Sequence, residues 1–185
     1  PKDEFTAYTN AVVMLKNVPM QINDTSRPSI ANIRESIRKI QHQYGSVGAV
    51  LVDYLQIMKT TKPFAREDLK IAYFTGELKA MAKEFHCVIV LLSQLNRELE
   101  KRPNKRPMMS DLRESGAIEQ DADQIIFLYR DEVYNKESQY RGIAEAIVGK
   151  NRHGEAGTAY MHSQLKYCQF TNLDHDALNQ IQGIE

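Results

Sequence analysis

The apolar stretch AVLVDYLQIM, residues 49–58, is interrupted by one acidic residue, Asp53. In an open α/β sheet, ligands bind outside the carboxyl ends of the strands, so a carboxylate at a strand end faces the binding crevice. Such an aspartate commonly holds the water shell of a magnesium ion on nucleotide phosphates. An aspartate that only hydrogen-bonds a turn fits the stretch equally well. Asp53 is therefore a candidate Mg²⁺ residue, with a structural role as the alternative.

A second apolar stretch, VLLSQLNRE (residues 90–98), ends in polar side chains: Ser93, Gln94 and Asn96. A neutral amide at the end of a neighbouring strand can donate a hydrogen bond to a terminal phosphate, and so sense whether that phosphate is present. A polar strand end that simply enters a loop gives the same pattern. Gln94 is the candidate sensor of nucleotide state.

A third stretch, SDLRESGAIEQDAD (residues 110–123), places Arg113 close to Gly116 at the start of a predicted short helix. Helix N-termini and arginine forks both bind phosphate oxygens. A solvated arginine at an ordinary helix entry is the alternative. The preceding loop, KRPNKRP (residues 101–107), concentrates four cations in seven residues. This loop either contacts DNA phosphates, which adds salt dependence to binding, or is a solvated mobile loop.

The elements that must position these residues follow from periodicity and turn signals. The patterns predict helices over 4–16, 30–44 and about 71–86, a short helix over 116–123, and strands over 20–22, 49–58, 87–94, 124–130, 142–150, 158–163 and 166–170. Ser29 is a candidate N-cap and Gly45 a candidate helix end. The run over 87–94 is typical of a central strand buried on both faces. The order predicts an α/β fold: a mostly parallel sheet flanked by helices, with antiparallel hairpin strands at its C-terminal edge.

Composition sets the frame for these sites. The chain has 185 residues, 42% of them apolar, and a formal net charge of zero, so any nucleic-acid binding must come from a local patch. Cys87 and Cys168 form no metal-binding spacing and fit reduced thiols in a cytoplasmic protein. We expect no membrane span, because no apolar run approaches about 18 residues.

Three separated stretches, residues 52–58 (VDYLQIM), 92–134 and 142–158 (GIAEAIVGKNRHGEAGT), together resemble the motor domain of DnaB-type replicative DNA helicases. Members of this family are hexameric RecA-like ATPases, and the similarity runs from about residue 19 to residue 173. The resemblance implies ATP and Mg²⁺ as cofactors, with single-stranded DNA and identical subunits of a ring hexamer as partners. It also implies primase and a helicase loader as partners, and 5′–3′ translocation coupled to duplex unwinding.

The resemblance assigns roles at the first two stretches. Asp53 matches the Walker B aspartate, which supports Mg²⁺ through water, and Gln94 matches the glutamine that contacts the γ-phosphate and links nucleotide state to the DNA-facing loops.

The remaining matches concern DNA and the subunit boundary. Arg113, Glu114 and Gly116 match the loop that holds the backbone of single-stranded DNA. Lys150 and Arg152 match a Lys-x-Arg pair that reaches into the neighbouring subunit's nucleotide site, with Arg152 as the arginine finger.

One motif that such an ATPase requires is missing from these 185 residues. The phosphate-cradling sequence G-x-x-x-x-G-K-[ST] does not occur, because Ala144 and Asn151 stand at two required positions around Gly149 and Lys150. The family places this P-loop upstream of Walker B. We therefore expect residues 1–185 to be the C-terminal portion of a motor domain, inactive when isolated, with residues 174–185 as a loose tail. The alternatives are a non-catalytic module that binds helicase subunits or a loader, and a recombination or clock-type ATPase of the same fold.

Overall fold

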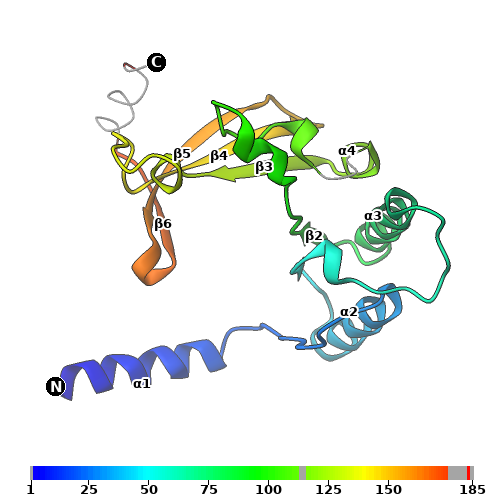
Figure 1. Ribbon diagram of the computed structural model, residues 1–185. Coiled ribbons are helices and arrows are strands. Elements are labelled where there is room, and N and C mark those ends of the chain that lie inside the picture. Colours follow the sequence, from blue (N-terminus) through cyan, green and yellow to red (C-terminus); the bar gives the residue numbers. More distant parts are fainter. Residues whose placement is uncertain (1, 113–115, 175–182, 184–185) are drawn as a thin grey trace.

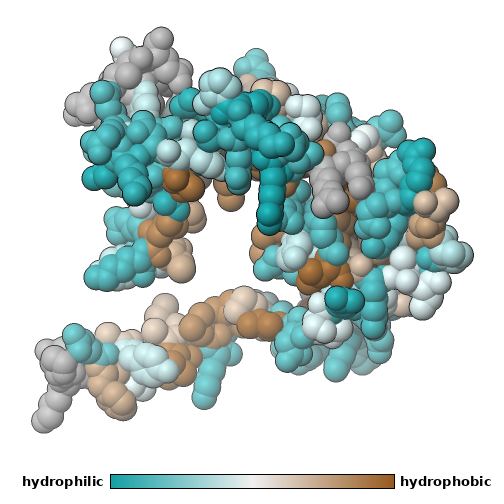
Figure 2. All heavy atoms as spheres, in the orientation of Figure 1, coloured by the Kyte–Doolittle hydropathy of each residue, from teal (hydrophilic) through white to brown (hydrophobic). Residues whose placement is uncertain are grey.

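The computed structural model describes residues 2–112, 116–174 and 183. Its first element is helix α1 (Lys2–Lys16), which projects from the rest of the molecule (Figure 1). Figure 2 shows apolar surface along this helix, and its exposed large apolar side chains are Phe5, Tyr8, Val13, Met14 and Leu15. No α1 residue belongs to the buried core formed by the described residues.

Helix α2 (Ile30–Tyr44) begins and ends where the sequence predicts. Ser29 Oγ accepts the Asn32 N–H at 3.2 Å and Asn32 Oδ1 accepts the Ser29 N–H at 3.1 Å, which together form a capping box. Gly45 ends the helix at φ 82°, a left-handed conformation that glycine adopts without strain. Of the apolar residues at helical spacing in α2, Ile30, Ile33 and Ile37 are buried, Ile40 is partly buried, and Tyr44 is 49% exposed.

Strands β1 (Ala49–Val52) and β2 (Val88–Leu91) pair in parallel, and helix α3 (Glu67–Glu84) lies in the connection between them. The largest fully buried side chains of the core come from α2, α3 and the segment after β1: Ile37, Leu55, Phe74 and Met81. Strand β1 is shorter than the predicted 49–58, because its pairing with β2 ends at Val52. A short 3₁₀-helix, η1 (Leu55–Ile57), follows.

Three other predictions about strands are wrong in whole or in part. The predicted strand over 166–170 begins inside a 3₁₀-helix (Leu165–Tyr167), and the strand itself runs over Gln169–Asn172. Residues 20–22 form no strand in the structure. Strand β2 is not buried on both faces, since Val88 is 62% and Val90 is 44% exposed. The neighbouring residues Ile89 and Leu91 pack against the core, so only one face of β2 is covered within the described parts of the chain.

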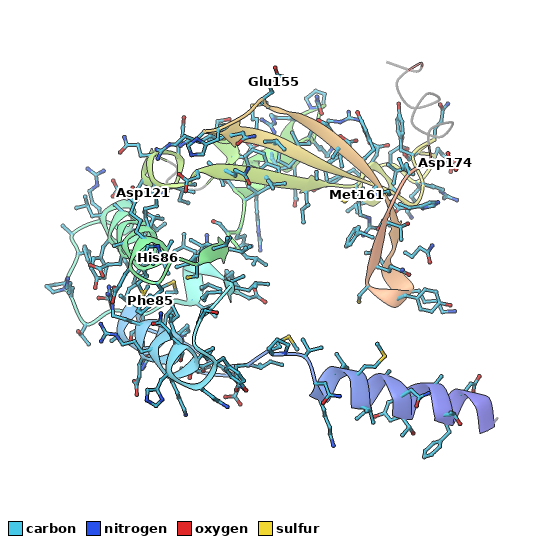
Figure 3. The ribbon with its side chains drawn as sticks, turned by 180° about the vertical axis from the view of Figure 1, so that it is seen from behind. Phe85, His86, Asp121, Glu155, Met161 and Asp174 are labelled. Atoms are coloured by element: carbon cyan, nitrogen blue, oxygen red, sulfur yellow. The ribbon has the colours of Figure 1, made fainter. Side chains whose placement is uncertain are left out.

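The C-terminal half forms an antiparallel sheet of its own. Strands β3 (Gln124–Tyr129), β4 (Ile143–Asn151), β5 (Gly157–Gln164) and β6 (Gln169–Asn172) pair in the order β3-β4-β5-β6. Successive antiparallel pairing confirms the predicted hairpins, and Figure 3 places Glu155 at the turn between β4 and β5. The sequence predicted that the hairpins would extend the β1–β2 sheet at its edge. In the structure they form a separate sheet.

Short helices connect the two sheets. The segment between β2 and α4 contains η2 (Arg97–Lys101) and η3 (Met109–Asp111), and the predicted short helix is α4 (Gly116–Asp121). Two further 3₁₀-helices, η4 (Asp131–Val133) and η5 (Leu165–Tyr167), lie between strands of the second sheet. The architecture is α/β, with a parallel pair flanked by helices and antiparallel hairpins after it. Among the described helices, none is long and apolar enough to cross a membrane.

Candidate functional site

Asp53 and Gln94 lie at the same edge of the parallel pair. Val52 is in register with Leu91, and the Leu55 N–H donates to the Leu92 carbonyl at 2.8 Å, so the two carboxyl-terminal strand ends stay together. The Asp53 side chain is exposed, and it has no hydrogen-bond or ion-pair partner among the described residues. The turn-bonding alternative for Asp53 therefore has no contact to support it there. A free carboxylate at this edge is suited to bind a hydrated cation.

Gln56 connects the Asp53 and Gln94 segments, and sequence reasoning missed it. Its Nε2 donates to Ser93 Oγ at 3.1 Å, and its Oε1 accepts the Gln94 N–H at 3.3 Å. The signal in the sequence is a single amide in the apolar run LQI, three residues after Asp53. Because Gln56 accepts the Gln94 N–H, it fixes the backbone position of the candidate sensor just after β2.

The segment after Gln94 is tied to the segment that precedes the predicted DNA loop. Leu95 and Leu112 form an isolated antiparallel bridge, and the Asn96 N–H donates to the Asp111 carbonyl at 2.7 Å. Arg113 and Glu114 lie outside the described residues. Gly116 is the first residue of α4, and nothing lies within 4 Å of the position where a Cβ would be. Backbone pairing thus connects the segment that follows Gln94 with Leu112, the last described residue before the predicted DNA loop.

Asp111 is the anchor of this bridge. The residue is only 5% exposed, and its carboxylate accepts the Met108 N–H at 2.9 Å and a hydrogen bond from Arg102 Nη2 at 2.6 Å. A buried carboxylate needs such donors, because an unpaired charge is costly to bury. Asp111 was not among the predicted site residues, and nothing in its spacing distinguishes it from a solvated aspartate.

The KRPNKRP loop pairs both of its arginines with buried carboxylates. Arg102 bonds Asp111, and Arg106 forms a bidentate pair with the buried Glu145 at 2.8 and 2.9 Å. The Arg106 guanidinium also lies 5.2 Å from the Tyr129 ring centroid. The hydrogen bond that Arg106 donates to Glu145 raises the pKa of Arg106, so this guanidinium is charged at every physiological pH. The picture of a solvated mobile loop is wrong for Arg102 and Arg106.

Tyr129 and Tyr134 stack on each other with ring centroids 5.9 Å apart. Burial, together with the hydrogen bond from its hydroxyl to Asp131 at 2.7 Å, raises the pKa of Tyr129. Their rings are engaged in packing within the chain, which fits the structural role of the sheet that carries them.

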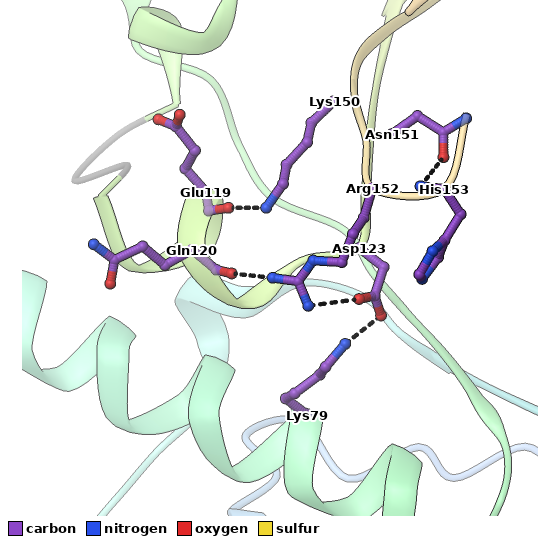
Figure 4. Close-up of polar contacts among 8 residues, drawn as sticks. All are labelled: Lys79, Glu119, Gln120, Asp123, Lys150, Asn151, Arg152 and His153. Atoms are coloured by element: carbon purple, nitrogen blue, oxygen red, sulfur yellow. Dashed lines mark hydrogen bonds and ion pairs between the residues drawn. The ribbon is translucent and has the colours of Figure 1, made fainter. Parts of the chain in front are cut away.

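Lys150 and Arg152 lie at the far end of β4, against the last residues of α4 (Figure 4). Lys150 Nζ donates to the Glu119 carbonyl, and Arg152 Nη2 donates to the Gln120 carbonyl at 3.2 Å. Cations are favourable at a helix C-terminus, where carbonyl groups are unpaired. Both cations of the predicted Lys-x-Arg pair thus contact the C-terminal end of the same short helix, α4.

Asp123 completes this cluster, and sequence reasoning missed it as well. Its carboxylate pairs with Arg152 Nη1 at 3.2 Å and with Lys79 of α3. The hydrogen bond from Lys79, with a further contribution from Arg152, lowers the pKa of Asp123. Asp123 therefore stays ionised and joins α3 to the tip of β4.

The predicted site residues fall into two separate groups. Asp53 and Gln94 follow the parallel strands, whereas Lys150 and Arg152 lie on the antiparallel sheet beside α4. The described residues contain no group of three His, Cys, Asp or Glu side chains that could enclose a metal ion. A parallel strand pair flanked by helices, with antiparallel hairpins after it, is the architecture expected of the class of RecA-like ATPase domains.

Comparison with known proteins identifies the family within this class. Residues 1–172 match the family described as DnaB-like helicase C terminal domain, and the chain belongs to that family. A solved structure described as an ATPase domain superposes with a TM-score of 0.86 at 39% identity, covering 90% of this chain and 59% of that one. A DnaB-like replicative helicase solved in a study of its interactions with primase gives a TM-score of 0.89 at 37% identity, covering 94% and 42%.

Curated relatives agree with this assignment. The replicative DNA helicase DnaB of Haemophilus influenzae is 45% identical over 152 residues, which cover 82% of this chain and 32% of the relative. The replicative DNA helicase DnaB of Pasteurella multocida is 44% identical over 173 residues, which cover 93% and 37%. The chain thus spans about a third of the length of these relatives.

Proposed function

We propose that this chain is the part of a hexameric replicative DNA helicase that runs from the Walker B aspartate, Asp53, to the arginine finger, Arg152. The complete helicase would couple ATP hydrolysis to 5′–3′ translocation on single-stranded DNA and to duplex unwinding. Family membership supports the proposal. So does the division of the site residues between two sheets, because an arginine finger serves the nucleotide of a neighbouring subunit rather than its own. The observation that carries it is the exposed, unpaired Asp53 beside Gln94 at the carboxyl edge of parallel strands.

On the nucleotide side, Asp53 would hold Mg²⁺ through water and Gln94 would contact the terminal phosphate. A single exposed carboxylate fits this ion, because Mg²⁺ keeps several waters and shares its other positions with substrate phosphates. Bound Mg²⁺ neutralises charge on the phosphates during hydrolysis. Asp53 orients the hydrated ion, and Gln94 passes the presence of the phosphate to the backbone bridge between Leu95 and Leu112.

At the subunit boundary, Lys150 and Arg152 would act on the next subunit's nucleotide. The Arg152 guanidinium is half exposed, so it is accessible to a phosphate across a subunit boundary. Its positive charge stabilises the charge on the transferring phosphoryl group, an effect worth about three or more orders of magnitude in rate.

For DNA, Arg113, Glu114 and Gly116 would hold the phosphate backbone of the strand in the central channel. The partners of the complete helicase would be single-stranded DNA, identical subunits, primase and a helicase loader, in the cytoplasm. The primase contact is supported by the DnaB-like helicase that was solved in a study of its interactions with primase.

A chimaeric helicase tests the proposal directly. The matched 173-residue segment of the Pasteurella multocida helicase is replaced by this chain, so that the relative supplies the rest of the polypeptide. We expect the chimaera to form hexamers and to hydrolyse ATP faster with single-stranded DNA, whereas the 185-residue chain alone binds no Mg–ATP in titration calorimetry. Asp53→Asn serves as the matched variant, because it removes one charge and keeps the shape.

Hexamers that hydrolyse ATP only with Asp53 intact would support the proposal. A chimaera that forms hexamers without DNA-stimulated hydrolysis would favour a non-catalytic interaction module. Tight Mg–ATP binding by the isolated chain would contradict the proposal, because it would show that these 185 residues hold the phosphates without the G-x-x-x-x-G-K-[ST] loop.

A further inference from the structure

Arg152 is held by more contacts than a solvated side chain needs. Its backbone N–H donates to the Asp123 carbonyl at 2.9 Å, its Nη1 pairs with the Asp123 carboxylate at 3.2 Å, and its Nη2 donates to the Gln120 carbonyl at 3.2 Å. All three acceptors lie on the last residues of α4 or on the link from α4 to β3 (Figure 4). The direction of the guanidinium is therefore set by the position of this segment.

Asp123 is shared between two cations. Lys79 on α3 bonds the carboxylate oxygen that Arg152 leaves free, so the carboxylate bridges α3 and the tip of β4. A second contact holds α4 on α3, because Thr75 Oγ1 donates to Asp121 Oδ2 at 2.5 Å. Both acidic groups are thus fixed by the same helix, and only Asp123 touches Arg152.

We propose that Asp123 is a positioning residue for Arg152: its carboxylate, held by Lys79, orients the guanidinium for insertion into the neighbouring subunit's nucleotide site. The inference rests on the proposed function, because it assumes that Arg152 acts as a finger. Asp123 is itself half exposed, so the pair is wet enough for a phosphate to draw the guanidinium away.

The same arrangement couples the finger to DNA. Helix α4 begins at Gly116, which is itself a residue of the predicted DNA loop, and its last residues accept hydrogen bonds from Lys150 and Arg152. The predicted DNA loop and the contacts of Lys150 and Arg152 thus lie at the two ends of one six-residue helix. Without the Asp123 carboxylate, the Arg152 guanidinium keeps only its hydrogen bond to the Gln120 carbonyl of α4, so we expect weaker stimulation of hydrolysis by DNA.

Mixing variants of the chimaeric helicase tests this role. Asp123→Asn should lower kcat about ten- to a hundredfold with little change in KM, since misplacement of a group that acts on the transition state has that signature. Mixed with Asp53→Asn, it should regain ATPase activity, because some interfaces then pair an intact Asp53 with an intact Asp123 and Arg152. Mixed with Arg152→Ala, it should regain none, because both defects lie on the same side of the interface.

Asp121→Asn is the matched control. It removes a carboxylate two residues away that bonds Thr75 and not Arg152, so it should leave kcat within about twofold of the parent. Asp123→Glu keeps the charge and should restore most of the activity. Hexamer formation is checked by light scattering, and Asp123→Ala replaces Asp123→Asn if that variant does not assemble.

The outcomes separate this inference from the function on which it rests. If Asp53→Asn and Arg152→Ala fail to complement each other although subunits exchange, the finger assignment is wrong. If they complement but Asp123→Asn also complements Arg152→Ala, or matches Asp121→Asn in kcat, only the positioning role is overturned.

Discussion

Arg106 and Arg152 are both paired with a carboxylate, but the two pairs lie in different surroundings. Glu145, the partner of Arg106, has a side chain only 4% exposed, whereas the side chain of Asp123, the partner of Arg152, is 46% exposed. Tyr129 also covers the Arg106 guanidinium. A buried bidentate pair costs much to break, while an exposed pair exchanges with water at little cost. The Arg106–Glu145 pair therefore holds the structure in place, whereas the Arg152–Asp123 pair can separate at little cost.

The largest expected effect separates activity from stability at the exposed pair. In the chimaeric helicase, Arg152→Ala should lower ATPase kcat by about 10³-fold or more, because the charge that stabilises the transferring phosphate is lost. Urea unfolding should change by less than about 0.5 kcal/mol, as for most exposed side chains. Asp53→Asn should lower kcat by a similar factor from the other side of the interface, and energy transfer between labelled subunits verifies exchange when the two are mixed. A large loss of stability in Arg152→Ala would remove the distinction between the two pairs.

The reverse pattern is expected at the buried pair. Arg106→Ala should reduce the free energy of unfolding by about 2–3 kcal/mol, since Glu145 remains buried without its cation, and the partial exposure of Arg106 keeps the loss below that of a fully buried pair. Urea denaturation of the chimaera measures it. The double variant Arg106→Met, Glu145→Leu should recover most of the stability, because two apolar groups replace both charges. A single variant as stable as the parent would show that burial does not distinguish the two arginines.

A second buried pair sharpens the comparison. The side chains of Arg102 and Asp111 are 28% and 7% exposed, and Asp111 anchors the backbone bridge between Leu95 and Leu112. Asp111→Asn should cost about 1–2 kcal/mol of stability, because the amide loses a charge-assisted bond but still accepts one hydrogen bond. It should also reduce the stimulation of ATPase by single-stranded DNA more than the basal rate. Equal losses in both rates would indicate that the bridge is structural only.

Much of this arrangement was predictable from the sequence. The spacing of Ile30, Ile33 and Ile37 and the caps Ser29 and Gly45 predicted helix α2 to the residue, because those signals act within a few positions of the chain. Asp53 and Gln94 were predictable as strand-end residues for the same reason. Because β1 and β2 pair in parallel, the residues that follow the two strands lie at the same edge of the sheet.

The partners of the arginines were not predictable, because they depend on contacts between distant segments. Glu145 reads as a polar residue in a strand, and only the approach of a loop 39 residues away shows that it is buried under Arg106. Asp123 and Lys79 are 44 positions apart. The two-sided burial predicted for β2 failed for a related reason: an apolar run shows which residues avoid water, not which element covers them.

The smallest expected effects concern the two lysines left in the KRPNKRP loop. Lys101 pairs with Glu98, and the side chains of the two residues are 73% and 66% exposed, so Lys101→Gln should change stability by less than about 0.5 kcal/mol. If the loop contacts DNA, the same variant should weaken binding of single strands similarly for all sequences and should reduce the salt slope by about one. Arg113→Ala, in the predicted DNA loop, is the positive control and should reduce the slope in the same way. Fluorescence anisotropy at several salt concentrations measures the slopes. An unchanged slope for Lys101→Gln beside a reduced slope for Arg113→Ala would show that Lys101 makes no phosphate contact, and would leave its role to the exposed pair with Glu98.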